Sequence, residues 1–363
     1  MSPALPLVPP PIERLLVDFD ARQPAALARA VSIVENQRDG FDVLLGALHS
    51  RIGRGRRIGI TGPPGAGKST LTTQLTRAYR AEGLTVGIVA VDPTSPFTGG
   101  ALLGDRIRME DVALDSGVFI RSLATRGSLG GLSSSTRVVA DVLDAFGFDR
   151  VLLETVGVGQ SELDIARVSE STVVVLVPES GDSIQALKAG LMEIGDVFAV
   201  NKSDRPGADR VRSDIELMIG MRSGWLTGAT PAHHGVELGA ITNPARAARE
   251  AARAEQSVVW VPPVVRTVAA KGEGVGDLIE ALERHFRYLS ASGELSRRRR
   301  ARWRAQILEV AEQRLRRRVW GDAHIRAFIE ESLPNVESGS STPFGIAEEL
   351  LRRAAGILTR TAT

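Results

Sequence analysis

Short apolar runs alternate with longer segments of helical spacing through the middle of the chain. The short runs predict buried strands at Arg57 to Thr61, Thr85 to Val91, Val118 to Arg121, Val151 to Glu154, Thr172 to Val177, Asp196 to Asn201 and Val264 to Ala269. Apolar residues three or four positions apart predict the intervening helices, among them Lys68 to Glu82, Thr136 to Phe146 and Ser183 to Gly195. Strands that alternate with helices form a mostly parallel sheet that helices cover on both faces. The pattern therefore predicts an α/β fold, which binds ligands at the carboxyl ends of its strands.

Helical spacing alone marks the two ends of the chain. Residues 12–50 carry apolar stripes and predict helices. The segment 297–318 is rich in arginine, but its apolar residues also recur at helical spacing: Trp303, Ile307, Val310, Ala311, Leu315 and Val319. We therefore expect a helical extension at residues 1–50, an α/β domain at 51–285, and a helical C-terminal arm at 286–363 that forms a dimer.

The composition of the 363 residues argues against several classes of protein. Without cysteine the chain has no disulfides, thiolate metal sites or cysteine nucleophiles, and its five histidines are scattered. No apolar run approaches the ~18 residues of a membrane span, and the uncharged segment 1–11 does not resemble a secretory signal. The formal net charge of +2 gives little support to a nucleic-acid partner. We expect a cytoplasmic protein that binds neither membrane nor nucleic acid.

Lysine is rare in this chain. Of 45 basic residues only four are lysine, namely Lys68, Lys188, Lys202 and Lys271. A chain that otherwise uses arginine should keep lysine where a compact ammonium on a flexible stem does what a planar guanidinium cannot. These four positions are therefore candidate functional residues.

One of these lysines lies in a phosphate-binding motif. The residues Gly62, Pro63, Pro64, Gly65, Ala66, Gly67, Lys68, Ser69 and Thr70 follow a predicted strand, open a predicted helix and contain G-x-x-x-x-G-K-[ST]. In such a loop, backbone amides and the helix N-terminus surround phosphate oxygens. Lys68 would contact the β- and γ-phosphates of a nucleotide, and the Ser69 hydroxyl would bind Mg²⁺. The motif predicts a P-loop nucleoside triphosphatase.

Two further motifs predict that the base is guanine. The first is N-K-x-D, formed by Asn201, Lys202, Ser203 and Asp204. A buried Asp204 carboxylate would accept hydrogen bonds from N1–H and the N2 amino group of guanine, which adenine does not offer. Asn201 would tether neighbouring loops, and Lys202 would lie along the base. The second motif, Ala269-Ala270-Lys271, is similar to the S-A-K element of GTPases with alanine in the place of serine, and a backbone amide there would meet guanine O6.

Acidic residues end two predicted strands beside the phosphate loop. Asp92 follows one apolar run, and Glu154 begins an E-x-x-G motif that ends at Gly157. A carboxylate at either place can hold Mg²⁺ directly or through water, and the longer Glu side chain favours contact through water. Between the two strands, Asp105 is a further Mg²⁺ candidate. Arg108 is a candidate to stabilise charge on the γ-phosphate or to report its loss.

The residue after the E-x-x-G motif is unusual for a GTPase. Val158 stands where many signalling GTPases place a glutamine that orients the attacking water, and nothing in the sequence shows that Gln160 reaches that water. We therefore predict intrinsic GTP hydrolysis slower than about 1 s⁻¹, which a partner accelerates.

Five segments together are similar to the methylmalonyl-CoA mutase-associated GTPases. This MeaB or ArgK type is related to the human methylmalonic aciduria type A protein and belongs to the SIMIBI class of P-loop GTPases. The segments are GPPGAGKST (62–70), VDPTSPFTGGALLGDRIRM (91–109), LLETVGVGQSE (152–162), VPESGDSIQALKAG (177–190) and NKSD (201–204). The resemblance extends over most of the chain, including both helical ends, whereas residues 228–263 are less similar to the family.

This resemblance implies a homodimeric GTPase that uses GTP and Mg²⁺ and binds an adenosylcobalamin-dependent methylmalonyl-CoA mutase. It would gate the loading of the mutase cofactor and protect or reactivate the mutase, without binding cobalamin itself. The Mg²⁺ positions of the family match Ser69, Asp92, Asp105 and Glu154. Segment 177–190 is similar to a further nucleotide-responsive switch that faces the mutase, with Asp182, Gln185 and Lys188 as candidate residues.

The sequence leaves other functions open. A nickel-inserting GTPase would share the phosphate and guanine motifs, but it needs Cys- or His-rich sites, and His233-His234 is the only pair of adjacent histidines here. A transport kinase for arginine or lysine would need an acceptor site and a base that no motif supplies. A nucleic-acid module could use the arginines of 297–300 and 314–318, whose charge also fits a solvated helix face. Within the resemblance itself, the client could be a different acyl-CoA mutase.

Overall fold

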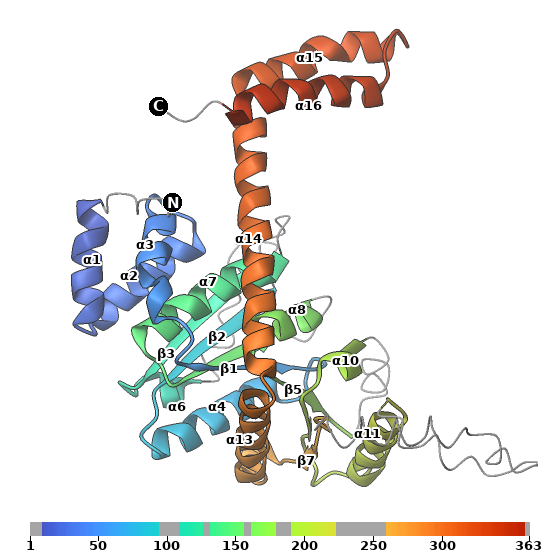
Figure 1. Ribbon diagram of the computed structural model, residues 1–363. Helices are drawn as coiled ribbons and strands as arrows, with labels where there is room; N and C mark the ends of the chain where they lie inside the picture. The colour runs from blue at the N-terminus through green and yellow to red at the C-terminus, as the bar shows by residue number, and fades with distance from the viewer. Residues whose placement is uncertain are drawn as a thin grey trace, which may run out of the picture. The chain divides into compact units, whose positions relative to one another are not determined.

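A seven-stranded sheet in the order β3-β2-β4-β1-β5-β6-β7 forms the centre of the fold (Figure 1). The computed structural model describes residues 9–93, 109–125, 131–155, 161–178, 190–222 and 259–359. The strands are β1 (Arg56–Thr61), β2 (Val86–Pro93), β3 (Val118–Thr125), β4 (Arg150–Thr155), β5 (Ser171–Leu176), β6 (Val197–Val200) and β7 (Val264–Arg266). Every neighbouring pair is parallel, so the predicted α/β class with its parallel sheet is confirmed.

Helices precede the sheet and connect its strands. The chain opens with α1 (Pro10–Asp20), α2 (Pro24–Glu35), α3 (Phe41–Leu48) and the 3₁₀ turn η1 (His49–Arg51). The connecting elements are α4 (Lys68–Ala81), α6 (Glu110–Ala113), α7 (Gly131–Phe146), α8 (Ser161–Val168), α10 (Met192–Ile194), α11 (Ala208–Arg222), η5 (Ala269–Lys271) and α13 (Val275–Ala291). The predicted helix from Lys68 is α4, and the one ending at Phe146 is α7. Of the helix predicted between Ser183 and Gly195, residues 183–189 lie outside the described part of the chain.

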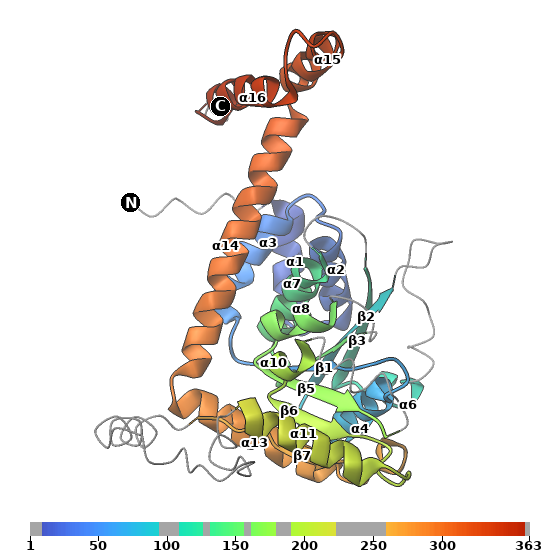
Figure 2. The ribbon, with the colours of Figure 1, turned by 90° about the vertical axis from the view of Figure 1, so that its right-hand side faces the viewer.

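Side chains of the central strands alternate between hydrophobic clusters on the two faces of the sheet. In β5, Val173 and Val175 pack in a cluster with α4 and α13, whereas Val174 and Leu176 pack in a cluster with α11. This follows from the two-residue period of a strand, and both sets are apolar because helices bury both faces. Helices α4, α6 and α13 cover one face, while α7, α8 and α11 cover the other (Figure 2).

The N-terminal helices share a core with the α/β region. Helices α1, α2 and α3 bury their apolar stripes in the same cluster as α7 and β4. Phe19 of α1 meets Phe146 of α7 edge to face, with ring centroids 4.9 Å apart. These helices therefore belong to the larger of two compact units, which comprises residues 1–298.

The smaller unit comprises residues 299–363 and is entirely helical where it is described. It contains most of α14 (Glu294–Gly321), followed by α15 (Ala323–Glu337) and α16 (Pro343–Thr359). Asp322 caps α15, since its Oδ1 accepts hydrogen bonds from the backbone N–H groups of His324 and Ile325 at 2.8 and 3.3 Å. The Arg353 guanidinium of α16 lies 3.9 Å from the ring centroid of Phe328 in α15.

Among the described residues, no helix is long and apolar enough to span a membrane.

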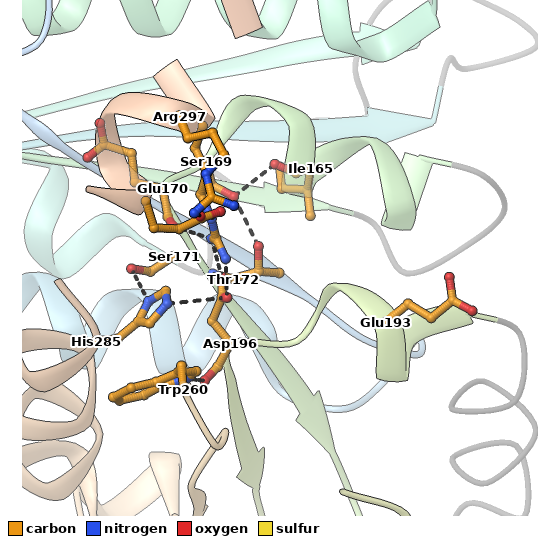
Figure 3. Close-up of polar contacts among 12 residues, drawn as sticks. Ile165, Ser169, Glu170, Ser171, Thr172, Glu193, Asp196, Trp260, His285 and Arg297 are labelled. Atoms are coloured by element: carbon orange, nitrogen blue, oxygen red, sulfur yellow. Dashed lines mark hydrogen bonds and ion pairs between the residues drawn. The ribbon is translucent and has the colours of Figure 1, made fainter. Parts of the chain in front are cut away.

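A buried polar cluster lies at the amino ends of β5 and β6 (Figure 3). Ser171 Oγ lies 2.8 Å from Nδ1 of His285, and Asp196 Oδ1 lies 3.3 Å from its Nε2. The Asp196 carboxylate also accepts hydrogen bonds at 2.9 and 3.0 Å from the Arg298 guanidinium. Trp260 Nε1 donates to the Asp196 carbonyl at 2.8 Å. Residues from three other segments of the chain therefore contact one aspartate, and Ser171 is joined to them through His285.

This cluster contains serine, histidine and aspartate, but its burial points to a structural role. The side chain of His285 is 0% exposed, and Ser171 and Asp196 are buried as well, so a substrate has no access to them. Burial lowers the pKa of His285 to about 4, and the neighbouring Asp196 carboxylate opposes only part of that effect. The imidazole is therefore neutral at pH 7 and serves as a buried connection between α13 and the sheet.

His285 should make the stability of the protein depend on pH. Because its pKa is about 4 in the folded protein and the ordinary value for histidine is 6.5, the unfolded chain binds the extra proton between these values. The stabilisation is complete above pH 6.5 and is lost as the pH falls toward 4. We expect about 2 kcal/mol less stability at pH 4.5 than at pH 7 from this group. Denaturant unfolding, followed by Trp fluorescence, should show a smaller pH dependence for His285→Gln.

The matched control is His324→Gln, which replaces an exposed histidine. It should retain the pH dependence of the unmodified protein. An unchanged pH dependence in His285→Gln would contradict this assignment.

Candidate nucleotide-binding site

Residues 62–67 form the loop between the end of β1 and the start of α4. Gly62 and Gly67 have φ angles of 137° and 87°, in the left-handed region. A β-carbon at Gly62 would collide with the Val175 carbonyl oxygen, and one at Gly67 would collide with Nδ2 of the Asn201 side chain. Both positions therefore require glycine on conformational and steric grounds. The loop leads into the amino end of α4, whose partial positive charge favours phosphate.

Lys68 extends back across the loop. Its Nζ donates hydrogen bonds to the carbonyl oxygens of Gly62 at 2.8 Å and Pro63 at 3.0 Å. The side chain is only 6% exposed, so the ammonium is held in place by the loop that would surround a phosphate. This placement fits the contact with the β- and γ-phosphates predicted from the motif.

The hydroxyl of Thr61, at the end of β1, connects this strand with the end of β4 and the start of α8. Thr61 Oγ1 accepts a hydrogen bond from Thr155 Oγ1 at 3.1 Å and donates to the Glu162 carbonyl oxygen at 3.5 Å. Burial raises the pKa of the Glu162 carboxyl group, and the Lys68 ammonium opposes part of the rise. Thr61, Thr155 and Glu162 were not among the predicted site residues, because Thr61 precedes the glycine motif, Thr155 occupies a variable position of E-x-x-G, and Glu162 follows that motif.

Glu154 lies against the first turn of α4. Its Oε1 accepts a hydrogen bond of 2.6 Å from Ser69 Oγ, and its Oε2 accepts one of 2.9 Å from Thr72 Oγ1. Glu154 is 4% exposed, and its place near the carboxyl end of β4 brings the E-x-x-G motif directly to the phosphate loop. Thr72 was not among the predicted site residues. Its position three residues after Ser69 on a helix was the available signal, since residues so spaced share a face.

The residues around Ser69 fit Mg²⁺. A hydroxyl and a carboxylate supply oxygen ligands, which Mg²⁺ prefers. Among the described residues, no group of three or more His, Cys, Asp or Glu side chains could hold a metal ion. Mg²⁺ at nucleotides usually also takes water and phosphate oxygens as ligands, and the side chains of the further candidates Asp92 and Asp105 lie outside the described part of the chain.

The other predicted residues of the phosphate and switch regions are only partly described. Asp92 lies near the end of β2, where its backbone pairs with Ala124 of β3, and nothing is described of its side chain. Residues outside the described part of the chain are Asp105, Arg108, Gly157, Asp182, Gln185 and Lys188. Their predicted roles stay predictions.

Asn201 joins the phosphate loop to the loop that follows β7. Its Nδ2 donates to the Ala66 carbonyl oxygen at 2.8 Å, and its Oδ1 accepts from the Ala269 backbone N–H at 3.0 Å and from Thr267 Oγ1 at 3.2 Å. Both polar atoms of the buried Asn201 side chain thus connect these loops, which agrees with the tethering role predicted for this residue. Lys202 follows with a positive φ of 55°, which turns the chain toward Asp204.

Asp204 and Lys271 lie together at the outer edge of these loops. Asp204 Oδ2 lies 3.3 Å from Lys271 Nζ, and the two side chains are 42% and 57% exposed. The carboxylate of Asp204 was expected to be buried, but in the protein alone it is partly exposed and pairs with the Lys271 ammonium. Lys271 belongs to η5, which also contains Ala269 and Ala270, so the two predicted guanine motifs are adjacent.

Comparison with known proteins identifies the family. The profile described as methylmalonyl-CoA mutase-associated GTPase MeaB matches residues 27–324. A protein of Pyrococcus horikoshii named as a GTPase is 39% identical over 347 residues, which cover 95% of this chain and 99% of that protein. The mouse methylmalonic aciduria type A homolog, mitochondrial by its name, is 29% identical over 94% of this chain and 79% of its own length.

A solved structure supports the same fold. The crystal structure named as an LAO/AO transport system kinase superposes with a TM-score of 0.61 at 23% identity, covering 96% of this chain and 97% of that one. At this identity the likeness concerns the fold and not the activity in that name. The phosphate loop, Glu154 and the N-K-x-D motif all lie within the matched residues 27–324. The chain therefore belongs to the MeaB family of methylmalonyl-CoA mutase-associated P-loop GTPases.

Proposed function

We propose that this GTPase is a nucleotide-dependent chaperone of an adenosylcobalamin-dependent methylmalonyl-CoA mutase, and that it gates cofactor loading and protects or reactivates the mutase. The observation that carries the proposal is the family profile, which names the mutase and matches residues 27–324. The mouse relative, whose name refers to methylmalonic aciduria, supports the same client. We place this function in the cytoplasm, in keeping with a chain that has no cysteine for disulfides.

The residues of the site have separate roles in this proposal. The glycine loop and Lys68 bind the phosphates, Asn201 keeps the phosphate and base loops together, and Asp204 selects guanine. Ser69 and Glu154 would hold Mg²⁺, with Asp92 and Asp105 as further candidates. When bound, Mg²⁺ neutralises charge on the β- and γ-phosphates.

Three segments that follow β2, β4 and β5 would carry the signal to the mutase. They contain Arg108, Gly157 and the candidate switch residues Asp182, Gln185 and Lys188. Strand β4 ends directly after Glu154, so a change at the γ-phosphate can reach the second segment through a single side chain. Loss of the γ-phosphate would then release contacts that only GTP supports.

Complex formation tests this proposal directly. The protein, loaded with GDP or a non-hydrolysable GTP analogue, would be mixed with the mutase and analysed by size-exclusion chromatography with light scattering. We expect a complex whose affinity depends on the nucleotide, and cobalamin transfer to the apo-mutase that requires GTP. A second acyl-CoA mutase, run in parallel, identifies the client. Failure to bind either mutase in any nucleotide state would contradict the chaperone function.

We further propose that the protein is a homodimer through its C-terminal arm. Helix α14 has no buried residue in the single chain, although it carries an apolar stripe. Within that stripe, Ile307 is 68% exposed, Leu315 47% and Trp303 44%. Apolar side chains at helical spacing would be covered by the same helix of a second copy.

A charge in the stripe should separate the two copies. Ile307→Glu places a carboxylate where two apolar surfaces would meet, and we expect light scattering to change from the dimer mass to the monomer mass at low micromolar concentration. GTP hydrolysis per chain should stay nearly constant, because the substitution lies outside the nucleotide site. Ala305→Glu adds the same single charge at an exposed position about 160° around the helix from Ile307, outside the stripe, and serves as the charge-matched control. A monomeric unmodified protein, or an Ile307→Glu variant that stays dimeric, would contradict the assignment.

A further inference from the structure

Two hydroxyl groups of α4 hold the two oxygens of the Glu154 carboxylate separately. Ser69 Oγ donates to Oε1 at 2.6 Å, and Thr72 Oγ1 lies 2.9 Å from Oε2. Ser69 and Thr72 are three residues apart, so both side chains lie on the same face of the helix. The Glu154 carboxylate is therefore fixed in orientation as well as in position.

Burial makes this contact strong. Thr72 is 0% exposed and Glu154 is 4% exposed. A carboxylate that is removed from water needs hydrogen-bond donors, and a hydroxyl that donates to a charged acceptor forms one of the stronger hydrogen bonds in proteins. Thr72 Oγ1 also lies 2.9 Å from the Lys68 carbonyl oxygen, so its single hydroxyl proton has two acceptors. The charged carboxylate is the stronger acceptor of the two.

We propose that Thr72 is a positioning residue for the nucleotide-bound Mg²⁺, because it fixes the carboxylate that contacts Ser69. The inference rests on the proposed site and adds to it a residue outside the phosphate-binding motif. Partners of this kind, which orient a ligand without touching the metal, change metal affinity by about 10- to 100-fold when they are removed. Loss of the Thr72 hydroxyl should therefore weaken the effect of Mg²⁺ on nucleotide binding.

The test measures GDP affinity over a series of Mg²⁺ concentrations, a readout that requires no catalysis. Thr72→Val removes the hydroxyl and keeps the branched shape, and Thr72→Ser restores a hydroxyl. Thr76→Val is the matched control, because Thr76 is also 0% exposed on α4 and donates at 2.8 Å to a backbone carbonyl, that of Thr72. We expect Thr72→Val to raise the half-saturating Mg²⁺ concentration by about 10-fold or more. Thr72→Ser and Thr76→Val should stay close to the unmodified protein.

A double variant shows whether Thr72 acts through Glu154. In Glu154→Gln the carboxylate is already absent, so adding Thr72→Val should change the Mg²⁺ dependence little. Circular dichroism and melting curves check that each variant folds. If Thr72→Val does not fold, Thr72→Ala replaces it in the measurements of Mg²⁺ dependence, alone and combined with Glu154→Gln.

Three results would overturn the inference. They are normal Mg²⁺ dependence in Thr72→Val, an equal loss in Thr76→Val, and additive losses in the double variant. If the unmodified protein hydrolyses GTP with Mg²⁺ while Thr72→Val binds Mg²⁺ normally, only this inference fails. If the unmodified protein neither binds nor hydrolyses GTP, the proposed function fails with it.

Discussion

Replacing Asp204 by Asn should lower the affinity for GTP by about 100-fold or more and should raise the affinity for XTP. In the proposed guanine complex the carboxylate would accept hydrogen bonds from N1–H and the N2 amino group, and the Asn amide nitrogen would instead face that amino group as a second donor. Xanthine carries a carbonyl oxygen at the same place and would accept from the amide. Because the Asp204 side chain is 42% exposed in the protein alone, we expect a loss below the largest known for buried polar contacts.

Competition between GTP and XTP measures this change without reference to the hydrolysis rate. Asp209→Asn is a suitable control, because that carboxylate is 83% exposed and pairs with Arg266 outside the proposed base contacts. Its ratio of GTP to XTP affinity should equal that of the unmodified protein. If Asp204→Asn also kept the GTP-to-XTP affinity ratio of the unmodified protein, Asp204 would not select the base.

Replacing Lys68 by Ala should lower kcat/KM for GTP by about 1000-fold. Lys68 is 6% exposed, and two loop carbonyls hold its ammonium at 2.8 and 3.0 Å, so the charge is in place before a nucleotide binds. Its removal takes away the positive charge nearest to the predicted β- and γ-phosphate positions. Lys68→Arg should not restore the rate, because a planar guanidinium does not replace a compact ammonium between those carbonyls.

Steady-state hydrolysis, with folding checked by circular dichroism, tests this prediction. Arg77→Ala removes a positive charge from the same helix α4, at a side chain that is 45% exposed and pairs with Asp111. It should retain hydrolysis within about twofold, since it lies outside the loop. Near-normal activity in Lys68→Ala, or an equal loss in Arg77→Ala, would contradict the role given to Lys68.

The sheet could be predicted from the sequence because its strands are buried on both faces. Runs such as Val151 to Glu154 and Thr172 to Val177 differ by only one residue at either end from β4 and β5. The predictions were weaker where apolar periodicity stops. Helix α7 begins at Gly131, five residues before the predicted start at Thr136. The apolar pattern missed its first turn, because that turn is rich in serine and glycine. The strand predicted to reach Ala269 ends at Arg266, because the chain turns into η5.

The site could be predicted where a motif lies within one continuous segment. The glycine positions of the phosphate loop and the tethering role of Asn201 follow from local patterns, and the geometry agrees with both. The Thr72 contact with Glu154 joins residues 82 positions apart. The Asp196 contacts with His285 and Arg298 are just as distant in sequence, and only the folded sheet brings such residues together.

The most direct test of a GTPase chaperone is the rate of GTP hydrolysis with and without the adenosylcobalamin-dependent methylmalonyl-CoA mutase of the same organism. ATP serves as the control nucleotide, and Lys68→Ala sets the background. We predict slow hydrolysis by the GTPase without a partner, below about 1 s⁻¹, and a strong rise in the rate when the mutase is added. Hydrolysis of ATP at the same rate would contradict the assignment of guanine. A GTP rate that neither this mutase nor another acyl-CoA mutase changes would contradict the chaperone function.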